Sequence, residues 1–206
     1  MDLPSKLLER TVEYFESLPG VGRRTALRYA LHLMKMQQED AFAFGQSISR
    51  LSTELGFCKV CHNISDHETC QICIHPKRDK NLICVVEDLR DLLAIEGTGQ
   101  YFGVYHVLGG VISPMDGVGP SELNIDSLVS RVEGSDTQEL IFALPATTEG
   151  DTTCFFIFKK LKHENVQMTS LARGVAVGNE LQYTDEVTLG RSILGRLPFE
   201  SSLRSH

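Results

Sequence analysis

Four cysteines in two closely spaced pairs constrain this chain more than any other feature. Cys58 and Cys61 form one Cys-x-x-Cys pair, and Cys70 and Cys73 form a second pair eight residues later. Two such turns bring four thiolates into a tetrahedron, which suits a single zinc ion. Two disulfides or a redox pair are the alternatives, but two pairs this close together favour zinc. Four protein ligands would close the site, so we expect a structural zinc ion.

Composition places the chain among globular proteins. It has 206 residues, of which 42% are hydrophobic, so it can bury a core. The first fifteen residues mix charged side chains with leucines and predict no secretory signal, and no apolar run is long enough to cross a membrane. Four cysteines in metal spacing fit a reducing compartment, so we expect a cytoplasmic protein.

Charge is distributed unevenly along the chain, whose net charge is −7. Residues 1–56 carry seven basic and seven acidic side chains, whereas residues 81–206 carry nine basic and seventeen acidic ones. Residues 19–38 contain no acid at all. A local cationic patch therefore precedes an acidic body, and any contact with phosphate should be confined to that patch.

The first third of the chain has helical periodicity. Apolar residues recur at helical spacing and predict helices over residues 3–17, 23–36 and 39–55. In the third helix we expect Phe42, Ile48, Leu51 and Leu55 to face inward, and Gly56 to form the C-cap.

After the cysteines the pattern changes to alternating strands and helices. Apolar runs predict strands over residues 82–86, 103–108, 140–144 and 166–170. Helical patterns fall between them, over residues 88–96, 121–132 and 148–162. This alternation predicts a parallel sheet covered on both faces. Residues 184–197 have helical spacing and are a candidate assembly segment.

The turn between the first two helices is a candidate phosphate site. Gly20 and Gly22 allow the backbone to approach a ligand closely, and the second helix begins with unpaired N–H groups. Arg24 and Arg28 share one helical face, and Arg23 adds a further charge. The string LPGVGRRTA resembles a helix-hairpin-helix motif, which grips the DNA backbone without reading bases. An ordinary helical hairpin with solvated arginines is the alternative.

Acidic residues follow two of the predicted strands. Glu87 and Asp88 follow the first strand, and Glu149 and Asp151 follow the third. This arrangement resembles the Toprim domain, in which a glutamate and paired aspartates hold Mg²⁺ for phosphoryl transfer. Pro145 and Thr147 stand where those aspartates would fall, so a Mg²⁺ site would be poorly supplied with ligands. We therefore favour Glu87, Asp88 and Glu149 as a partner-binding surface over a Mg²⁺-dependent nuclease or primase-like enzyme.

The order of these parts resembles the bacterial RecR family of recombination proteins over essentially the whole chain. The most specific strings are LPGVGRRTA, CKVCHNISDHETCQIC, VVEDLRDLLAIEGTGQYFGVYHVLGGVISPMDGVGP and TLGRSILGR. The fold class implied is α/β, with four parts. They are a helix-hairpin-helix domain (1–56), a zinc finger with four cysteines (57–80), a Toprim domain (81–175) and a C-terminal assembly segment (176–206).

The resemblance implies a DNA-binding, non-enzymatic protein of recombinational repair that is cytoplasmic and associated with the nucleoid. RecR-like proteins form homotetrameric rings that encircle duplex DNA. With RecO and RecF they help load RecA onto single-stranded DNA. On that pattern Arg24 and Arg28 contact DNA, and Glu149 lies on the surface that meets RecO. A zinc adaptor that binds only protein is a further alternative. If the hairpin arginines do not bind DNA, Lys77, Arg78 and Lys80 are the next candidates.

Overall fold

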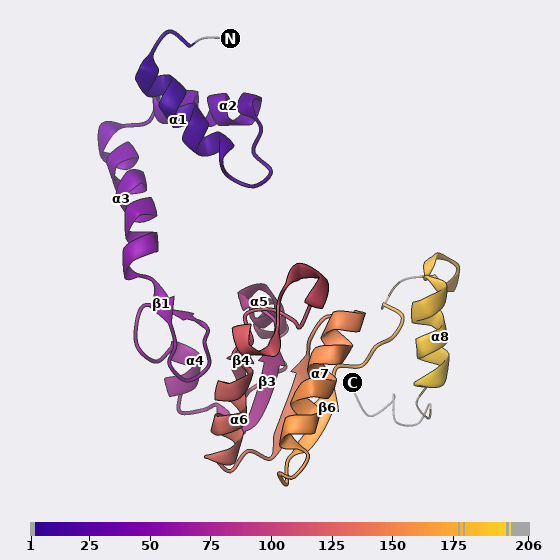
Figure 1. Ribbon diagram of the computed structural model, residues 1–206. Coiled ribbons are helices and arrows are strands. Elements are labelled where there is room, and N and C mark those ends of the chain that lie inside the picture. The colour runs from indigo at the N-terminus through magenta and orange to yellow at the C-terminus, as the bar shows by residue number, and fades with distance from the viewer. Residues whose placement is uncertain (1–2, 177, 179, 197, 199–206) are drawn as a thin grey trace. The chain divides into compact units, whose positions relative to one another are not determined.

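Helices make up the N-terminal unit, Met1–Leu55, of this computed structural model, which describes residues 3–176, 178, 180–196 and 198. The elements are α1 (Lys6–Glu16), α2 (Arg23–Leu33) and α3 (Gln38–Glu54) (Figure 1). Ser5 caps α1 by accepting a hydrogen bond from the backbone N–H of Leu8. Helices α1 and α2 pack around Val12, Ala26 and Ala30, which are all buried. The predicted stripes of the first two helices thus supply this small core, although Leu7, Leu31 and Met34 at the same helical spacing are exposed.

The prediction that α3 turns its apolar residues inward is wrong. None of its residues is buried, and Phe42, Ile48 and Leu51 are 66%, 54% and 64% exposed. The described part of the chain supplies no face that covers them. The predicted glycine cap is also wrong. The C-cap is Leu55 in an extended conformation, and Gly56 enters strand β1 (Gly56–Phe57) directly, so no left-handed residue is needed.

The second unit, Gly56–His206, begins with the cysteine segment. Strand β1 pairs antiparallel with β2 (Ile64–Ser65), and a short helix, α4 (Gln71–Ile74), follows the second cysteine pair. We call residues 56–75 the zinc module. The α/β elements come next: β3 (Asp79–Val86), α5 (Leu89–Gly97), β4 (Gly103–Val107), α6 (Ile125–Glu133), β5 (Glu139–Ala143), α7 (Thr148–Leu161) and β6 (Gln167–Ser170).

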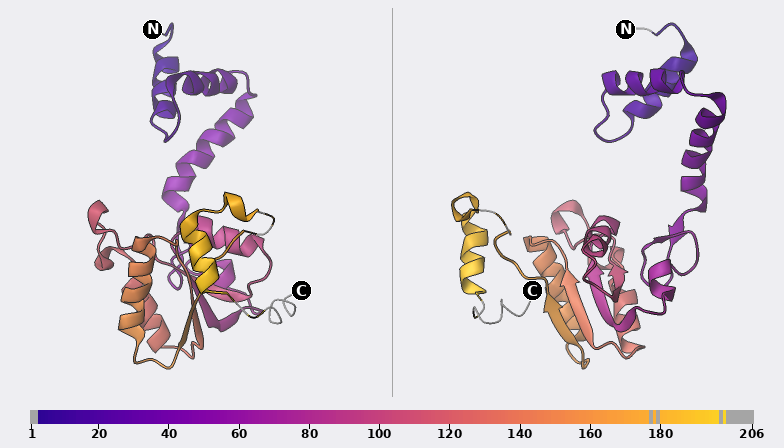
Figure 2. Two further views of the ribbon diagram at one scale, coloured as in Figure 1. Left: turned by 90° about the vertical axis from the view of Figure 1, so that its right-hand side faces the viewer. Right: turned by 180° about the vertical axis from the view of Figure 1, so that it is seen from behind.

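The central sheet is parallel and has the strand order β4-β3-β5-β6. Ile83 and Val85 face α6 and α7 on one side, whereas Cys84 and Val86 face Leu92 of α5 on the other. Figure 1 shows α6 and α7 in front of the strands, and Figure 2 shows the strands from behind. The predicted sheet covered on both faces is confirmed, and it explains why β3 and β4 read as continuous apolar runs.

The helix predicted over residues 121–132 begins later than expected. Its first residues belong to the 3-10 helix η2 (Pro120–Glu122), and a further 3-10 helix, η1 (Pro114–Asp116), lies in the loop before it. Leu123 is extended, with φ −105° and ψ 156°, so α6 begins only at Ile125. The tail forms η3 (Leu181–Tyr183) and α8 (Glu186–Leu194), and neither has a buried residue. The rest of the predicted assembly segment, at 177, 179, 197 and 199–206, lies outside the described residues.

Candidate zinc centre and nucleic-acid interface

The four cysteine sulfurs form one buried cluster. Cys58, Cys61, Cys70 and Cys73 are each at most 7% exposed, and their sulfurs all lie within 4.8 Å of one another. The sulfurs of Cys61 and Cys70 are 3.5 Å apart. Four thiolates about 2.3 Å from a zinc ion lie about 3.8 Å from each other, so these side chains fit a tetrahedral zinc ion. They supply all four positions, so the site has no room for a reacting water.

Backbone N–H groups favour the thiolate form of Cys58. Burial raises the pKa of the Cys58 thiol, but backbone hydrogen bonds from Cys70, Cys61 and Val60 outweigh it and lower this pKa to about 7. The backbone N–H of Cys70 lies 3.3 Å from the Cys58 sulfur. The thiolate is the form that binds a metal, so the turn that positions the Cys58 sulfur also favours its metal-binding form. Among the described residues outside glycine, only His62 has a positive φ, of 59°, at the end of the first turn.

The zinc module is fastened along the edge strand of the sheet. Strand β4 has β3 on one side only. On its other side, the Val107 N–H donates to the carbonyl of Cys61 at 2.8 Å. Arg131 of α6 donates to the carbonyls of Tyr105 and Val60, at 2.7 and 3.5 Å. These bonds satisfy backbone groups that an open edge strand would expose, and they hold the zinc module against the sheet.

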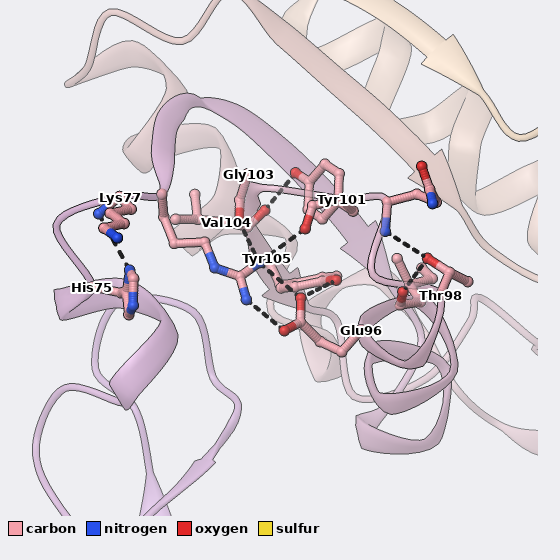
Figure 3. Close-up of polar contacts among 11 residues, drawn as sticks. His75, Lys77, Glu96, Thr98, Tyr101, Gly103, Val104 and Tyr105 are labelled. Carbon is pink, nitrogen blue, oxygen red and sulfur yellow. Dashed lines mark hydrogen bonds and ion pairs between the residues drawn. The ribbon is translucent and has the colours of Figure 1, made fainter. Parts of the chain in front are cut away.

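A polar network joins the segment that follows the zinc module to α5 and to the start of β4. Arg78 donates to both carboxylate oxygens of Glu96, at 2.8 and 2.5 Å. The same guanidinium donates to the carbonyls of Tyr101 and Gly103. The Tyr105 hydroxyl donates to Glu96 at 2.7 Å (Figure 3). The side chains of Arg78 and Glu96 are only 17% and 25% exposed, so the network is largely desolvated. Arg78, a fallback DNA candidate in the sequence, is therefore engaged within the fold.

We expect replacement of Arg78 by methionine to destabilise the second unit by about 3 kcal/mol, because Glu96 would keep a poorly hydrated charge without its partner. The pKa of Glu96 lies below its usual value because Arg78 hydrogen-bonds to it. The stability from this pair is therefore present above the unfolded pKa of Glu96 and is lost as the pH falls through the folded one. Urea unfolding measures the loss.

The exposed pair Arg50–Glu54 on α3 provides the matched control, because both side chains are more than half exposed. We expect Arg50→Met to leave stability nearly unchanged, since solvent screens such pairs. The double variant Arg78→Met with Glu96→Gln removes both charges, so it should recover part of the lost stability. Equal stability of Arg78→Met and the wild-type protein would show that this network does not stabilise the second unit.

The candidate DNA residues lie at the start of α2. Gly22 is the N-cap and offers no side chain to the first N–H groups of the helix, and Gly20 has a φ of 76°. Arg24 and Arg28 line a shallow cavity of about 420 Å³. Leu27, Leu31, His32 and Lys35 complete its lining. The guanidinium of Arg23 instead lies 3.4 Å from a carboxylate oxygen of Glu16 in α1. The structure therefore brings Arg24 and Arg28 together in one groove, with Arg23 outside it.

The sequence interpretation overlooked His32 as part of this groove. Its position four residues after Arg28 puts both side chains on one face of α2, so helical spacing alone would have found it. Lys35 lies within the acid-free stretch of residues 19–38. The groove thus carries Arg24, Arg28 and Lys35 along α2, and Arg24 lies in the first turn with the free N–H groups, which is an arrangement that suits phosphate.

The acidic residues at the strand ends have unequal roles. Asp88 caps α5 and binds Arg90 through its side chain, and this hydrogen bond to Arg90 holds its pKa below the usual value. Burial raises the pKa of Glu87, and the nearby charges of Asp91 and Asp88 raise it further. Glu149 lies in the first turn of α7, where the helix dipole stabilises a negative charge.

The residues that stand in place of the Toprim aspartates serve the backbone. Thr147 is the N-cap of α7 and accepts a hydrogen bond from the N–H of Gly150 at 3.2 Å. A Cβ atom on Gly150 would lie 2.0 Å from the carbonyl oxygen of Pro145, so only glycine fits beside this loop. Within the described ranges, the four cysteines are the only group of three or more His, Cys, Asp or Glu side chains positioned to hold a metal ion.

The part of the chain that the structure describes contains no helix with the length and apolar character needed to cross a membrane.

Four family models match successive parts of this chain. Two of them describe the RecR helix-hairpin-helix (residues 8–51) and the RecR zinc finger domain with four cysteines (55–74). The other two describe a Toprim domain (81–172) and the RecR C-terminal region (174–197). The zinc-finger match contains all four clustered cysteines, and together these findings are consistent with one zinc ion per chain. The Toprim match covers the parallel sheet with its helices.

Curated relatives are similar along nearly the whole length. The chain is 56% identical to the recombination protein RecR of Bacteroides fragilis over 200 residues, which is 97% of this chain and 98% of that protein. It is 57% identical to that of Phocaeicola vulgatus over 196 residues, 95% of this chain and 96% of the relative. The Flavobacterium johnsoniae RecR is 51% identical over 206 residues, all of both chains. The zinc centre, the helical hairpin and the parallel sheet thus occur in one known order, and the chain belongs to the RecR family of recombination proteins.

Proposed function

We propose that this protein is a ring-forming DNA clamp that acts with RecO and RecF to help load RecA onto single-stranded DNA during recombinational repair. The observation that carries the proposal is the groove on α2, where Arg24 and Arg28 lie beside free helix N–H groups in a RecR-family chain. Its partners are duplex and single-stranded DNA. Each chain offers few phosphate contacts, and the acidic remainder of the chain repels DNA. Several grooves that face the central hole of one ring would raise the effective concentration of binding sites.

Exposed apolar faces support assembly into a homotetramer. Helix α3 leaves Phe42, Ile48 and Leu51 open to solvent, and α8 does the same with Ile193 and Leu194, which are 58% and 83% exposed. Patches of this kind mark protein contacts. One face lies in each unit, which suits paired N-terminal and paired C-terminal regions. The mass of the protein in solution, with and without long duplex DNA, tests the ring. A monomer under both conditions would exclude a clamp.

The absence of catalysis is part of the proposal. Thr147 and Pro145 occupy the places of the paired Toprim aspartates, and Thr147 is used as a helix cap. Two remaining acids, Glu87 and Glu149, make a poor ligand set for Mg²⁺. Incubation with duplex and single-stranded DNA and Mg²⁺ or Mn²⁺ tests this directly. Cleavage or primer synthesis by the wild-type protein, abolished in Glu87→Ala, would establish an enzyme instead.

Zinc binding by Cys58, Cys61, Cys70 and Cys73 is proposed as structural. Zinc bound there would join the two turns of the zinc module, and the module in turn covers the edge of β4.

The proposed location of the protein is the cytoplasm, in association with the nucleoid.

Glu149, Glu87 and Asp88 are proposed to meet RecO or RecF. Glu149 is exposed at the start of α7, so it is free to contribute charge complementarity to a partner. We expect Glu149→Ala to weaken the complex with the partner about tenfold, mainly through slower association, and to leave DNA binding unchanged. Surface plasmon resonance with RecO and RecF from the same genome measures the effect.

Glu164 provides the matched control for Glu149, because it is an exposed acid just beyond the other end of α7. Glu164→Ala makes the same change in net charge and should leave partner binding intact. If both variants weaken binding equally, the effect comes from net charge, and the docking surface lies elsewhere.

A further inference from the structure

One face of α7 carries aromatic and basic side chains that the sheet does not use. Phe155 and Phe158 are 56% and 49% exposed, although Ile157 and Leu161 of the same helix are fully buried. Residues 155, 158, 159 and 162 follow helical spacing and are all exposed. We call Phe155, Phe158, Lys159 and Lys162 the α7 stripe. Burial of large apolar side chains stabilises a fold, so two half-exposed rings one turn apart need another explanation.

The α7 stripe is basic within an acidic region. Residues 152–163 contain three lysines and one histidine and no acid, although residues 81–206 carry nine basic and seventeen acidic side chains. Lys160 pairs with Asp126 of α6 at 2.6 Å. Among the described residues, neither Lys159 nor Lys162 has a carboxylate within ion-pairing distance. The helix dipole stabilises lysines at the C-terminal end of a helix, but this does not explain why the neighbouring phenylalanines are exposed.

The rings and the ammonium groups are arranged next to each other. The Lys159 ammonium lies 4.7 Å from the centre of the Phe155 ring. The ring of Phe158 is half exposed one turn further along. A nucleotide carries a flat base and a phosphate only a few bonds apart, so one stacking ring beside one cation matches its chemistry.

We propose that the α7 stripe binds single-stranded nucleic acid, with unpaired bases stacked on Phe155 and Phe158 and phosphates held by Lys159 and Lys162. Paired bases in a duplex do not expose their faces, so this surface would select single strands. Stacking does not read base edges, so the binding would depend little on sequence. The stripe lies in the second unit and does not depend on the groove that Arg24 and Arg28 form in the first.

Binding of labelled oligothymidine and of duplex DNA by the full chain tests the proposal. We expect Phe155→Ala combined with Phe158→Ala to weaken oligothymidine binding at least tenfold and to leave duplex binding unchanged. Lys159→Ala combined with Lys162→Ala should make the slope of log affinity against log salt shallower by about 1.4, since each single-strand phosphate contact accounts for about 0.7. Phe102→Ala is the matched control. That ring is 67% exposed and has no lysine within five positions in the sequence, so its loss should change nothing.

Two results would overturn the proposal. One is unchanged oligothymidine affinity in the phenylalanine double variant; weaker binding of RecO or RecF by that variant would then assign the α7 stripe to a protein partner. The other is a lower mass in solution for that variant, which would assign the α7 stripe to a contact between copies of the chain. The variant Arg24→Ala with Arg28→Ala, measured in parallel, separates a failure of the hairpin groove from a failure of the α7 stripe.

Discussion

Replacing Cys70 by serine is expected to abolish zinc binding and to unfold the zinc module. The ion holds together two turns that have little apolar core of their own, since the four sulfurs themselves make up the buried cluster around Ile72. Zinc binding contributes on the order of 10 kcal/mol to the folding of small zinc fingers, so its loss leaves this segment without stable structure. Elemental analysis should give about one zinc ion per wild-type chain and none in the variant.

The second unit should lose stability in the same variant, because the zinc module covers the edge of β4 through Cys61 and Val60. A fall of several kcal/mol would lower the melting temperature by on the order of 10 °C in a unit of this size. Cys154→Ser is the control. That thiol is half-buried outside the cluster, so zinc content should stay at one ion. A chelated wild-type protein that keeps its melting temperature would refute a structural role for the metal.

The parallel sheet and the zinc centre could be predicted because the responsible signals are local. Cysteine spacing alone identifies four side chains whose sulfurs gather in one cluster. The apolar run through Ile83 and Val85 identifies a strand buried on both faces. Each of these signals depends on a short stretch of sequence and on a geometry that few structures satisfy.

Other features depend on what lies across from a residue in space, which periodicity does not report. Phe42 and Ile48 have helical spacing like that of Val12, but only Val12 has a neighbouring helix to bury it. Arg78 looked like a free cation, yet Glu96, eighteen residues away, accepts two of its hydrogen bonds, and the carbonyls of Tyr101 and Gly103 accept two more. The same limit applies to Asp88, which reads as a free surface acid and is engaged as a helix cap and with Arg90.

The hairpin arginines are expected to dominate binding to duplex DNA. Arg24 and Arg28 line one groove along α2 that suits phosphate, and contacts to phosphate carry no sequence information, so Arg24→Ala combined with Arg28→Ala should weaken binding equally for every duplex sequence. The change repeats in every chain of an assembly, so binding at physiological salt should be nearly lost. The slope of log affinity against log salt should become shallower by about one for each phosphate contact removed.

The double variant Arg10→Ala with Arg50→Ala is the matched control, because it removes two exposed arginines of the same unit and changes the net charge equally. It should bind duplex DNA almost as the wild-type protein does, since phosphate contacts act at short range in physiological salt. Zinc content and melting temperature should be normal in both variants, because solvated arginines contribute little to stability. If both variants lose affinity for duplex DNA equally, and both show an equally shallower salt dependence, DNA binding depends only on the overall charge of the chain. If neither does, the DNA contacts lie outside the groove, with Lys77 and Lys80 as the next residues to replace, since Arg78 between them is held by Glu96.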